Sequence, residues 1–420
     1  MGWINPGAAP GRDLTRSDLP YYNVSNNRAV GNGVVDDTAA IQAALDTDAP
    51  VVQLDPTKTY LISSTLLLRK YQTLMGAPRS LGAPYTSPVG GATLKFRTGS
   101  ADTCIGNVPG VFGQCVNGVA FDLASADNVA VGFKSSYSNR VENCAFSGTM
   151  AIGVYLDLTY VCEVSRASFL GALVRDYSVY VGDTNAVTVY KLHTSGYGQS
   201  ASVASVGCGI HSGAGHSIID PIIQGADIGI SVFSGSALTI NNPYFENTLC
   251  PIRIGQPVSG QLVIGTSIFG GRYIGVNAAH PNFSKRGPII YGAAFDYLTM
   301  FNPSFATTKV VDANSYPMVF DLGANLCTIH GARMYLSTMR DEMFRSEANA
   351  NVQLTVTGSK YGTNNATEMI LKKDGAYGST SYRLGVDTSG TIVTTAYQPA
   401  IVSTAVDSFL RSAFAVPTLP

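Results

Sequence analysis

The sequence has few charged residues and almost no net charge. Only 13% of its 420 residues are Asp, Glu, Lys or Arg, and 27 basic residues nearly balance 28 acidic ones, for a net charge of −1. This balance provides no basic surface for nucleic acid and no attraction to anionic membranes. With 45% hydrophobic residues, the chain is also too apolar to be disordered. We therefore expect a folded protein that binds no nucleic acid.

Paired cysteines and long apolar runs are also missing. The seven cysteines occur singly and no CxxC pair is present, which disfavours a zinc site or a redox motif. Cys104 and Cys115 could bridge, but we interpret all seven as small buried thiols of a chain folded in a reducing cytosol. No apolar stretch has the length of a transmembrane span, and residues 1–6 show no signal-peptide pattern. We expect no membrane insertion, no metal and no cofactor.

What the sequence does contain is a recurring spacing of large apolar residues. These anchors are Phe146, Phe169, Leu192, Ile223, Phe245 and Phe269. Their spacing is nearly constant, except for one longer step between Leu192 and Ile223. A period in the low twenties, with β-rich sequence between anchors, is typical of a solenoid in which each coil buries an inward residue. Because each coil packs only on its neighbours, the length of the chain does not require several globular domains.

The N-terminal segment predicts a lead-in followed by a cap. Residues 1–30 are rich in Pro, Gly, Asn and Arg and have no period, so we interpret them as a lead-in or linker. In residues 31–45, GNGVVDDTAAIQAAL, Asp36 or Asp37 can cap a short helix with Ile41, Ala44 and Leu45 on one face. Such a helix would cover the open end of the solenoid core. Short strands are predicted within residues 50–54, 60–64 and 65–68.

The segment GNGVVDDTAAIQAAL, followed by TYLISSTLLL and TLMGAP, resembles the N-terminal signature of the pectate-lyase-like superfamily. These proteins are right-handed parallel β-helices, and the signature GDGxxDDTxAIQxAI is common in phage tailspike proteins and some secreted glycanases. Here Asn32 stands where Asp is usual. The resemblance covers roughly residues 28–80 and includes no catalytic residue. It implies a carbohydrate substrate and often a homotrimer.

The sequence changes character after about residue 350. Residues 352–357 alternate strictly, residues 369–371 run into a turn, and residues 382–386 face residues 391–393 across another turn, all of which predict antiparallel hairpins. We assign residues 31–345 to the parallel β-helix with its cap, and residues 346–420 to a small C-terminal antiparallel β domain. In tailspike-like proteins such a region commonly caps the last coil and holds the trimer together. A carbohydrate-binding module and a plain cap are the alternatives.

A polar column precedes the anchors by three residues. Its members are Asn143, Arg166, Val189, Asp220, Asn242, Thr266 and Asn302. Equivalent positions of successive coils stack at about 4.8 Å, so these side chains would form a ladder of turn residues that bond to the backbone. Asp220 is the acidic residue in this ladder, and it retains a functional interpretation beside the structural one.

The residues directly after the anchors predict the candidate site. His193, Gln224 and Glu246 would lie side by side on one exposed face, either as ordinary surface residues or as part of a ligand site. Four more residues follow their anchors closely and would enlarge this patch. They are Asp227, Asn247, Arg272 and Tyr273. We interpret Gln224, Asn247, Arg272, Tyr273 and His193 as substrate-binding residues.

Glycoside hydrolysis needs two carboxyl groups, one on either side of the bond to be broken. Glu246 and Asp227 lie on adjacent predicted coils, and their offset along the strand is compatible with an inverting, water-mediated geometry. Asp296 follows a possible aromatic anchor and is the reserve carboxylate. A metal site at His211 and His216 is disfavoured because no third ligand is near in sequence.

The long step between Leu192 and Ile223 points to the same place. Its additional residues form a loop within residues 196–207 that contains Tyr197, a further substrate-binding candidate. Long loops on a rigid scaffold often carry binding sites, although a tolerated insertion is equally common.

Three functions are compatible with these observations. The first is a phage tailspike-like, homotrimeric protein of the virion that binds and hydrolyses a bacterial polysaccharide at the host surface, namely capsule, exopolysaccharide or O-antigen. The second is a receptor-binding or adhesive virion protein of the same fold without chemistry. The third is a polysaccharide lyase, in which His193 and Arg272 could act as base and charge neutraliser. A secreted glycanase is the alternative to a virion location.

Overall fold

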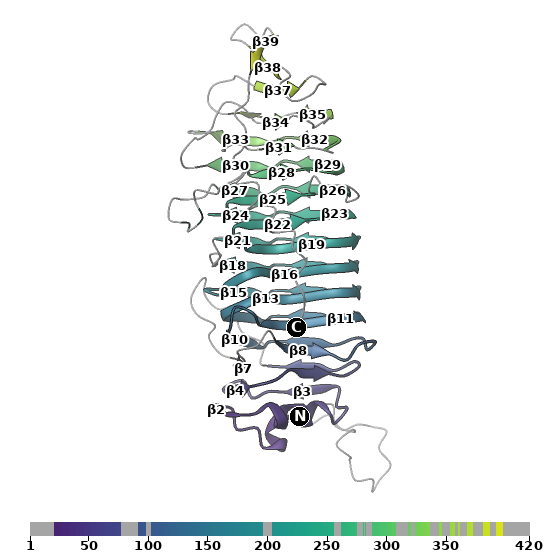
Figure 1. The fold of residues 1–420 in the computed structure, drawn as a ribbon, viewed down its shortest axis with the longest axis vertical. Helices are drawn as coiled ribbons and strands as arrows, with labels where there is room; N and C mark the ends of the chain where they lie inside the picture. Colours follow the sequence, from purple (N-terminus) through teal and green to yellow (C-terminus); the bar gives the residue numbers. More distant parts are fainter. Residues whose placement is uncertain are drawn as a thin grey trace, which may run out of the picture.

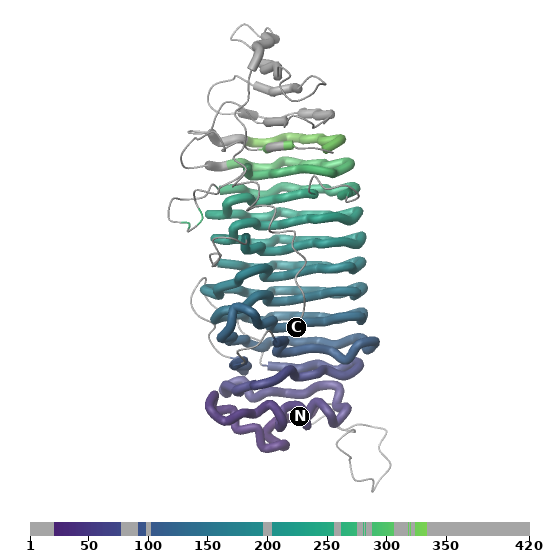
Figure 2. Tube along the Cα trace, viewed as in Figure 1, coloured from purple at the N-terminus to yellow at the C-terminus, as the bar shows by residue number. Residues whose placement is uncertain are grey.

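The computed structural model describes most of the chain between residues 21 and 336 and isolated strands beyond. The described residues are 21–76, 91–97, 102–195, 204–255, 262–274, 280, 282, 288–307, 318–320 and 324–336, followed by the strands within 344–346, 353–357, 360–361, 368–372, 381–386 and 392–397. From residue 22 to residue 361 the described strands form a parallel β-helix, in which one unclosed parallel sheet winds into a stack of coils (Figures 1 and 2).

The coils have three faces, each a ladder of parallel strands. Face A consists of β1 (Tyr22–Asn23), β3 (Val51–Gln53), β6 (Thr73–Met75), β9 (Cys115–Asn117), β12 (Arg140–Glu142), β14 (Glu163–Ser165), β17 (Thr188–Tyr190), β20 (Ser217–Ile219), β23 (Gly235–Asn241), β26 (Val263–Phe269), β29 (Phe295–Phe301), β32 (Leu326–His330) and β35 (Gln353–Thr357). Face B consists of β2 (Asn32–Asp36), β4 (Thr59–Ile62), β7 (Thr93–Phe96), β10 (Ala120–Ala124), the start of β13 (Ala145–Tyr160), β15 (Ser168–Leu170), β18 (His193–Ser195), β21 (Ile222–Gln224), β24 (Tyr244–Glu246), β27 (Arg272–Ile274), β30 (Ser304–Thr307), β33 (Arg333–Leu336) and β36 (Lys360–Tyr361). Face C consists of β5 (Leu66–Leu68), β8 (Thr103–Asn107), β11 (Val129–Tyr137), the remainder of β13, β16 (Leu173–Asn185), β19 (Val206–Ala214), β22 (Ile228–Val232), β25 (Cys250–Ile254), β28 (Ile290–Gly292), β31 (Met318–Phe320) and β34 (Phe344–Ser346).

Left-handed residues turn the chain from face A to face B. At this A–B corner the backbone φ is 53° at Asn143, 50° at Asp220, 46° at Asn242 and 51° at Asn302. Asn and Asp tolerate this conformation better than other residues with a side chain. The predicted turn is therefore confirmed at these positions, although the Asn242 amide bonds to the Asp220 side chain of the neighbouring coil rather than to the backbone. Val189 and Thr266 do not belong to it, because both lie inside face A strands.

The interior of face B is a ladder of large side chains, as the anchors predict. Phe146 and Phe169 stack with their ring centroids 4.3 Å apart, and Ile223 is paired with Phe245 on the next coil. Two predicted anchors are wrong. Thr194, rather than Leu192, continues the ladder after Phe169, and Tyr273, rather than Phe269, continues it after Phe245.

This shift has a simple cause. Face B strands are very short in this part of the chain, so the choice of the nearest apolar residue can miss the register by a few positions. Leu192 is buried at the corner just before β18, and Phe269 ends a face A strand with 41% of its surface exposed.

A short helix covers the first coils, as predicted. Helix α1 (Thr38–Leu45) follows Asp37 and buries Ile41, Ala44 and Leu45. The Asp36 carboxylate accepts the backbone N–H of Thr38. The Asp37 carboxylate instead accepts the N–H groups of Val30 and Gly31, which fixes the approach to the cap.

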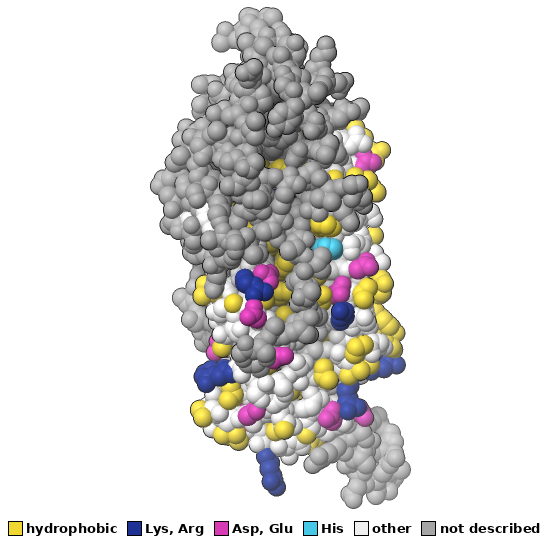
Figure 3. All heavy atoms as spheres, in the orientation of Figure 1, with side chains coloured by type: hydrophobic (Ala, Val, Ile, Leu, Met, Phe, Trp, Pro, Cys, Tyr) yellow, Lys and Arg dark blue, Asp and Glu magenta, His cyan; other side chains and the backbone are white. Residues whose placement is uncertain are grey.

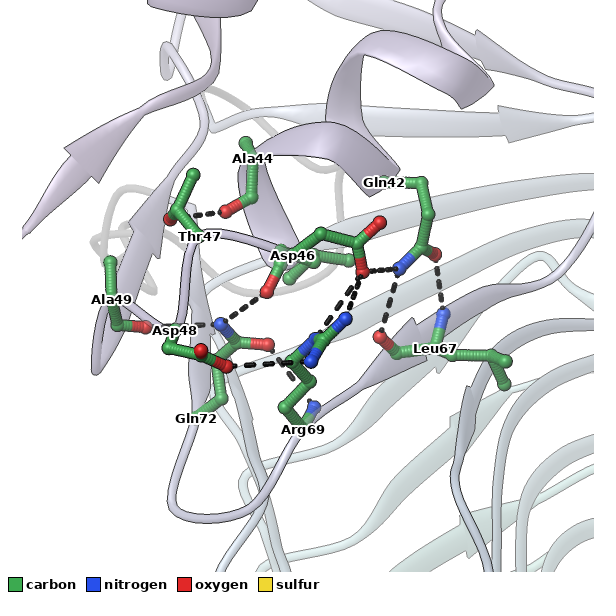
Figure 4. A network of polar contacts seen from close by, with 10 residues as sticks. Gln42, Ala44, Asp46, Thr47, Asp48, Ala49, Leu67, Arg69 and Gln72 are labelled. Carbon is green, nitrogen blue, oxygen red and sulfur yellow. Dashed lines mark hydrogen bonds and ion pairs between the residues drawn. The ribbon is translucent and has the colours of Figure 1, made fainter. Parts of the chain in front are cut away.

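Side-chain amides tie this cap to the coils (Figure 4). Gln42 of α1 bonds to both backbone groups of Leu67 on β5, and the buried Gln72 donates to the carbonyls of Leu45 and Ala49. These bonds satisfy backbone groups that the end of a solenoid would otherwise leave open.

The two ends of the solenoid extend beyond the residues expected from sequence. β1 pairs with β3, and a 3-10 turn (Val24–Asn27) follows it, so part of the predicted lead-in belongs to the first coil. β35 pairs in parallel with β32, which corrects the antiparallel hairpin expected at residues 352–357. The antiparallel expectation is confirmed further on, where β37 (Glu368–Lys372), β38 (Ser381–Val386) and β39 (Ile392–Tyr397) form a separate sheet. The domain boundaries themselves stay a prediction.

All seven cysteines are buried free thiols. Burial raises their pKa, to about 12 for Cys208 and to about 11 for Cys115. No helix within the described ranges is long and apolar enough to cross a membrane. In the same ranges, no three His, Cys, Asp or Glu side chains are grouped as metal ligands.

Candidate functional site

A groove crosses the outer surface of face B where three consecutive coils meet. It has a volume of about 790 Å³ and is formed by β21, β24 and the start of β27, with the A–B corner that precedes them. Its lining residues are Asp220, Pro221, Ile222, Gln224, Asn242, Pro243, Tyr244, Glu246 and Arg272. The strands lie at the left edge of the ribbon in Figure 1.

The alternation of short strands explains why polar side chains converge here. In β24, Phe245 points into the core and is fully buried, so Tyr244 and Glu246 on either side of it point outward. The same pattern in β21 buries Ile223 and leaves Ile222 and Gln224 outside. Because β21 and β24 pair in register, Gln224 lies beside Glu246.

Glu246 is the most firmly held carboxylate of the groove. Its Oε2 accepts a hydrogen bond of 2.7 Å from the Gln224 amide and one of 3.0 Å from the Tyr244 hydroxyl. Two donors on a single oxygen fix the direction of the carboxylate. An oriented carboxylate of this kind can accept a proton from a sugar hydroxyl or from a water molecule.

Asp220 supplies a second carboxylate at the other end of the groove. It belongs to the A–B corner, where its Oδ1 accepts a hydrogen bond of 3.2 Å from the Asn242 amide of the next coil. Both interpretations of Asp220, as a turn residue and as a functional residue, are therefore compatible with the structure. Asp220 bonds like a ladder residue and also lines the groove.

His193 and Arg272 occupy the outward column on the other side of the core ladder. His193 pairs with Ile222, Ile222 with Tyr244, and Tyr244 with Arg272. His193 was predicted to share a column with Gln224 and Glu246. Ser195 occupies that position instead, and His193 lies two residues earlier on the same strand. It still reaches Gln224 diagonally through a hydrogen bond. Burial lowers the pKa of the His193 imidazole, and the Gln224 bond offsets part of this effect.

Asp227 does not line the groove. Its carboxylate is fully buried below the B–C corner, where it accepts bonds from the Ser205 N–H and hydroxyl, both at 2.9 Å, and from the Asn282 amide at 2.8 Å. His280 lies 3.9 Å from the same carboxylate. Ser205 follows β18 and both His280 and Asn282 follow β27, which indicates that Asp227 ties these residues to the coil.

The other predicted residues are divided between core, turn and a distant face. Tyr273 is fully buried as a core anchor, and Asn247 is 7% exposed in the left-handed turn after β24. Asp296 lies at the corner between faces C and A, where its carboxylate accepts the Asn325 amide at 2.9 Å. Tyr197 lies outside the described residues. The connection that contains it begins directly after Ser195, the strand partner of Gln224.

The structure thus brings Gln224, Glu246 and Arg272 together in one groove with His193 beside it. It adds Tyr244, which sequence reasoning missed and which directly precedes the anchor Phe245. The signal was available, because alternation exposes the residue before a buried anchor as well as the one after it.

No protein-family model matches this chain, and no curated protein matches its sequence. Solved structures of several parallel β-helix proteins are similar to it. A double mutant of the tailspike protein of E. coli bacteriophage HK620, in complex with pentasaccharide, is 13% identical with a TM-score of 0.64, over 82% of this chain and 67% of that one. The A-module of the Azotobacter vinelandii mannuronan C-5 epimerase AlgE6 is 15% identical with a TM-score of 0.52, over 82% and 100%. The Streptococcus pneumoniae surface protein and adhesin PfbA is 12% identical with a TM-score of 0.52, over 82% and 98%. At these identities the likeness concerns the fold.

Proposed function

We propose that this protein binds a bacterial surface polysaccharide in the face B groove and cleaves it by glycosidic hydrolysis. The observation that carries the proposal is the groove itself. It combines two carboxylates, two amides, a phenol and a guanidinium on a rigid β-helix. Hydroxyl-rich ligands need such mixed donors and acceptors, and hydrolysis needs two carboxyl groups. The solved tailspike complexes with pentasaccharide support the ligand class by analogy of fold.

In the proposed reaction Glu246 and Asp220 are the two carboxyl groups. Glu246, oriented by hydrogen bonds from Gln224 and Tyr244, removes a proton from the attacking water. Asp220 gives its proton to the leaving glycosidic oxygen. Asp227 was the partner expected from sequence, and its burial supports replacing it with Asp220 in this role. Gln224, Tyr244, Arg272 and His193 hold the sugars around the bond that breaks.

We further propose that the protein works as a homotrimer on a phage virion, at the surface of the host cell. Exposed apolar side chains occur on the upper coils at the edge of face A, among them Leu262, Ile264 and Tyr297 at 44%, 44% and 54% exposure. Such side chains are suited to contacts between copies. Residues 346–420 would cap the last coil and secure the trimer, and a neighbouring copy could complete the groove.

The test uses purified capsular polysaccharides and O-antigens from a set of bacteria, together with mannuronan. Wild-type protein should release reducing ends from at least one polymer without the ultraviolet absorbance of unsaturated uronates. Glu246→Gln and Asp220→Asn should each lower the rate by about 100-fold or more, within the range lost with a general acid or base. Asp296→Asn is the matched control and should retain the wild-type rate.

Other outcomes separate the alternatives. Reducing ends together with uronate absorbance would indicate a lyase, with His193 and Arg272 as its first candidates. Binding with neither signal would indicate an adhesive, receptor-binding protein. Full activity in both the Glu246→Gln and Asp220→Asn variants would overturn the assigned pair even if the polymer were cleaved.

A further inference from the structure

A second set of side chains at the corner between faces C and A has no role in the groove. Four aromatic residues from successive coils follow this C–A corner along the solenoid axis. They are Tyr71, Phe112, Tyr137 and Tyr160. Tyr71, Tyr137 and Tyr160 are 62%, 45% and 47% exposed. Large aromatic side chains that stay exposed in a row are uncommon on a surface that has no partner.

The rings are held in place by one another and by the backbone. Phe112 stacks on Tyr137 with centroids 4.3 Å apart and meets Tyr71 edge-on at 4.9 Å. The Lys70 ammonium lies 4.1 Å from the Phe112 centroid. Tyr160 is the strand partner of Tyr137 on the next coil. The surface is therefore rigid before any ligand arrives, which lowers the entropy lost on binding.

Charged side chains run beside these rings on the outer surface of face C. Lys134 and Asp157 are strand partners, and the Lys134 Nζ lies 4.0 Å from the Asp157 Oδ2. Each lies three residues before the exposed tyrosine of its own strand, Tyr137 or Tyr160. On the next coil the backbone N–H of Asp183 donates to Asp157 at 3.2 Å, and the Asp183 carboxylate is exposed. Figure 3 shows hydrophobic and charged side chains interleaved toward the right of the visible face.

We propose that this C–A corner is a second binding surface for a neutral polysaccharide chain that lies along the solenoid axis. The inference rests on the proposed polysaccharide-binding function but uses none of the groove residues. Pyranose rings present C–H faces that pack on aromatic rings and hydroxyls that donate to carboxylates. Lys70 and Lys134 balance the carboxylates of Asp157 and Asp183, so the surface has no excess of positive charge that would favour an acidic polymer such as mannuronan.

A second copy of the chain is the other candidate occupant, and the charges disfavour it. A dry contact between copies would bury Asp157, Asp183 and Lys134, at a cost that only well-placed partners offset. A saccharide provides hydroxyl donors and keeps water nearby, so these groups remain solvated or hydrogen-bonded. Four coils also span roughly 14 Å at about 4.8 Å per step, which suits an oligosaccharide rather than a single sugar.

Tyrosine acetylation with N-acetylimidazole, read by peptide mass spectrometry, tests the proposal. The Glu246→Gln chain is used so that polymers remain intact, and each neutral polymer of the panel and mannuronan are added in turn. At least one neutral polymer should protect Tyr137 and Tyr160 several-fold. Tyr21, 57% exposed just before the first coil, is the internal control and should stay reactive. Mannuronan should protect none of them.

Matched variants give an independent measurement. Tyr137→Ala combined with Tyr160→Ala should weaken binding of the protecting polymer about 10-fold, which corresponds to about 1.4 kcal/mol, because two rings on which the sugars pack are lost. Tyr21→Ala should leave the dissociation constant unchanged. Cleavage of a short oligosaccharide that fits only the groove should also be unchanged in the double variant.

The outcomes distinguish this inference from the groove proposal. If a polymer is cleaved but none protects Tyr137 and Tyr160, the second surface is overturned and the groove proposal is still supported. Protection of Tyr137 and Tyr160 without cleavage by the wild-type protein supports the second surface and contradicts hydrolysis in the groove. Protection that rises with protein concentration in the absence of polymer identifies a contact between copies and overturns the inference. Protection by mannuronan overturns the assignment to neutral polymers.

Discussion

At the scale of single residues, burial separates side chains that sequence spacing placed together. Glu246 and Asp227 both follow an anchor of the face B ladder closely, yet the Glu246 side chain lines the groove and Asp227 is fully buried against Ser205 and Asn282. The donors that seal Asp227 include Asn282, 55 positions away in the chain. A buried carboxylate with this many donors organises structure, because its removal leaves several polar groups without a partner.

Asp227→Asn should therefore act on stability rather than on chemistry. An amide in place of the carboxylate puts its own donors against those of Ser205 and Asn282, and we expect a loss of about 2–4 kcal/mol in unfolding free energy. Thermal unfolding and the cleavage rate at a temperature well below the midpoint are to be measured together. The rate per folded molecule should stay close to that of wild type.

Asp220→Asn is the matched control for that experiment. It makes the same chemical change at a partly exposed corner, so its unfolding midpoint should not move while its cleavage rate falls. An Asp227→Asn protein with a normal midpoint and no activity would restore Asp227 as a catalytic residue.

Part of the candidate site was accessible from sequence. Glu246 and Gln224 were placed side by side because Ile223 and Phe245 are true anchors, and Arg272 was placed nearby. Asp220 was recognised as a turn residue but was not joined to the groove, because nothing in sequence shows that the corner and the end of the strand open into the same hollow. Tyr273 could not be placed correctly once Phe269 was taken as the anchor.

At the scale of strands, the same residue type has opposite roles according to its face. Phe169 is 1% exposed in the face B core ladder, whereas Phe269 is 41% exposed at the end of a face A strand, where it stacks on Phe301. A period in the sequence does not distinguish a buried face B position from an exposed face A position, because every face repeats once per coil.

Truncation of these two phenylalanines to alanine should lower the free energy of unfolding by very different amounts. Phe169→Ala removes a ring stacked between coils and leaves a cavity, so the unfolding free energy should fall by about 3–5 kcal/mol. Phe269→Ala removes a partly solvated ring and should cost less than about 1 kcal/mol. Urea unfolding followed by circular dichroism provides both values. Equal losses would contradict the corrected register.

Register was the least predictable property of the elements. In a strand of three residues, the single inward position decides which residues face solvent. In β18 that position is occupied by Thr194, a polar residue that the search for apolar anchors passes over. Sequence reasoning preferred Leu192, which is also buried but at the corner. Existence and order of the strands followed from turn residues and alternation, so the architecture was recovered even where the register was not.

At the scale of the whole molecule, buried histidines couple stability to pH. Burial is the main cause of a lowered pKa for His193, His211, His216 and His280. In the unfolded chain a histidine titrates near its ordinary pKa of about 6.5. Below that pH the unfolded state binds more protons than the folded state, so the unfolding free energy falls as the pH falls.

The thermal midpoint should accordingly decrease as the pH is lowered from about 7 to about 5.5. His216→Gln should flatten this dependence, because the His216 Nδ1 accepts the Val187 N–H in the folded chain and loses that role when protonated. Differential scanning calorimetry at constant ionic strength measures both. A midpoint that stays constant or rises over this range would contradict the linkage.

The overall architecture was the most predictable level. The helix that covers the first coils, the parallel β-helix and the antiparallel sheet near the C-terminus all follow from local patterns repeated many times, so errors at single positions do not accumulate. The site is not repeated, and it depends on contacts between coils and connections that no period describes.

The cap at α1 has a consequence for how the protein is made. A ribosome delivers the chain from its N-terminus, so α1 and the first coils that bond to it, as far as Gln72, are complete before the coils above them have been synthesised. Each new coil then finds a finished surface to pair with, and at about 5–20 residues per second each coil emerges within roughly 1–5 seconds. Folding can thus keep pace with translation in one direction, and the growing edge is exposed only until the next coil arrives.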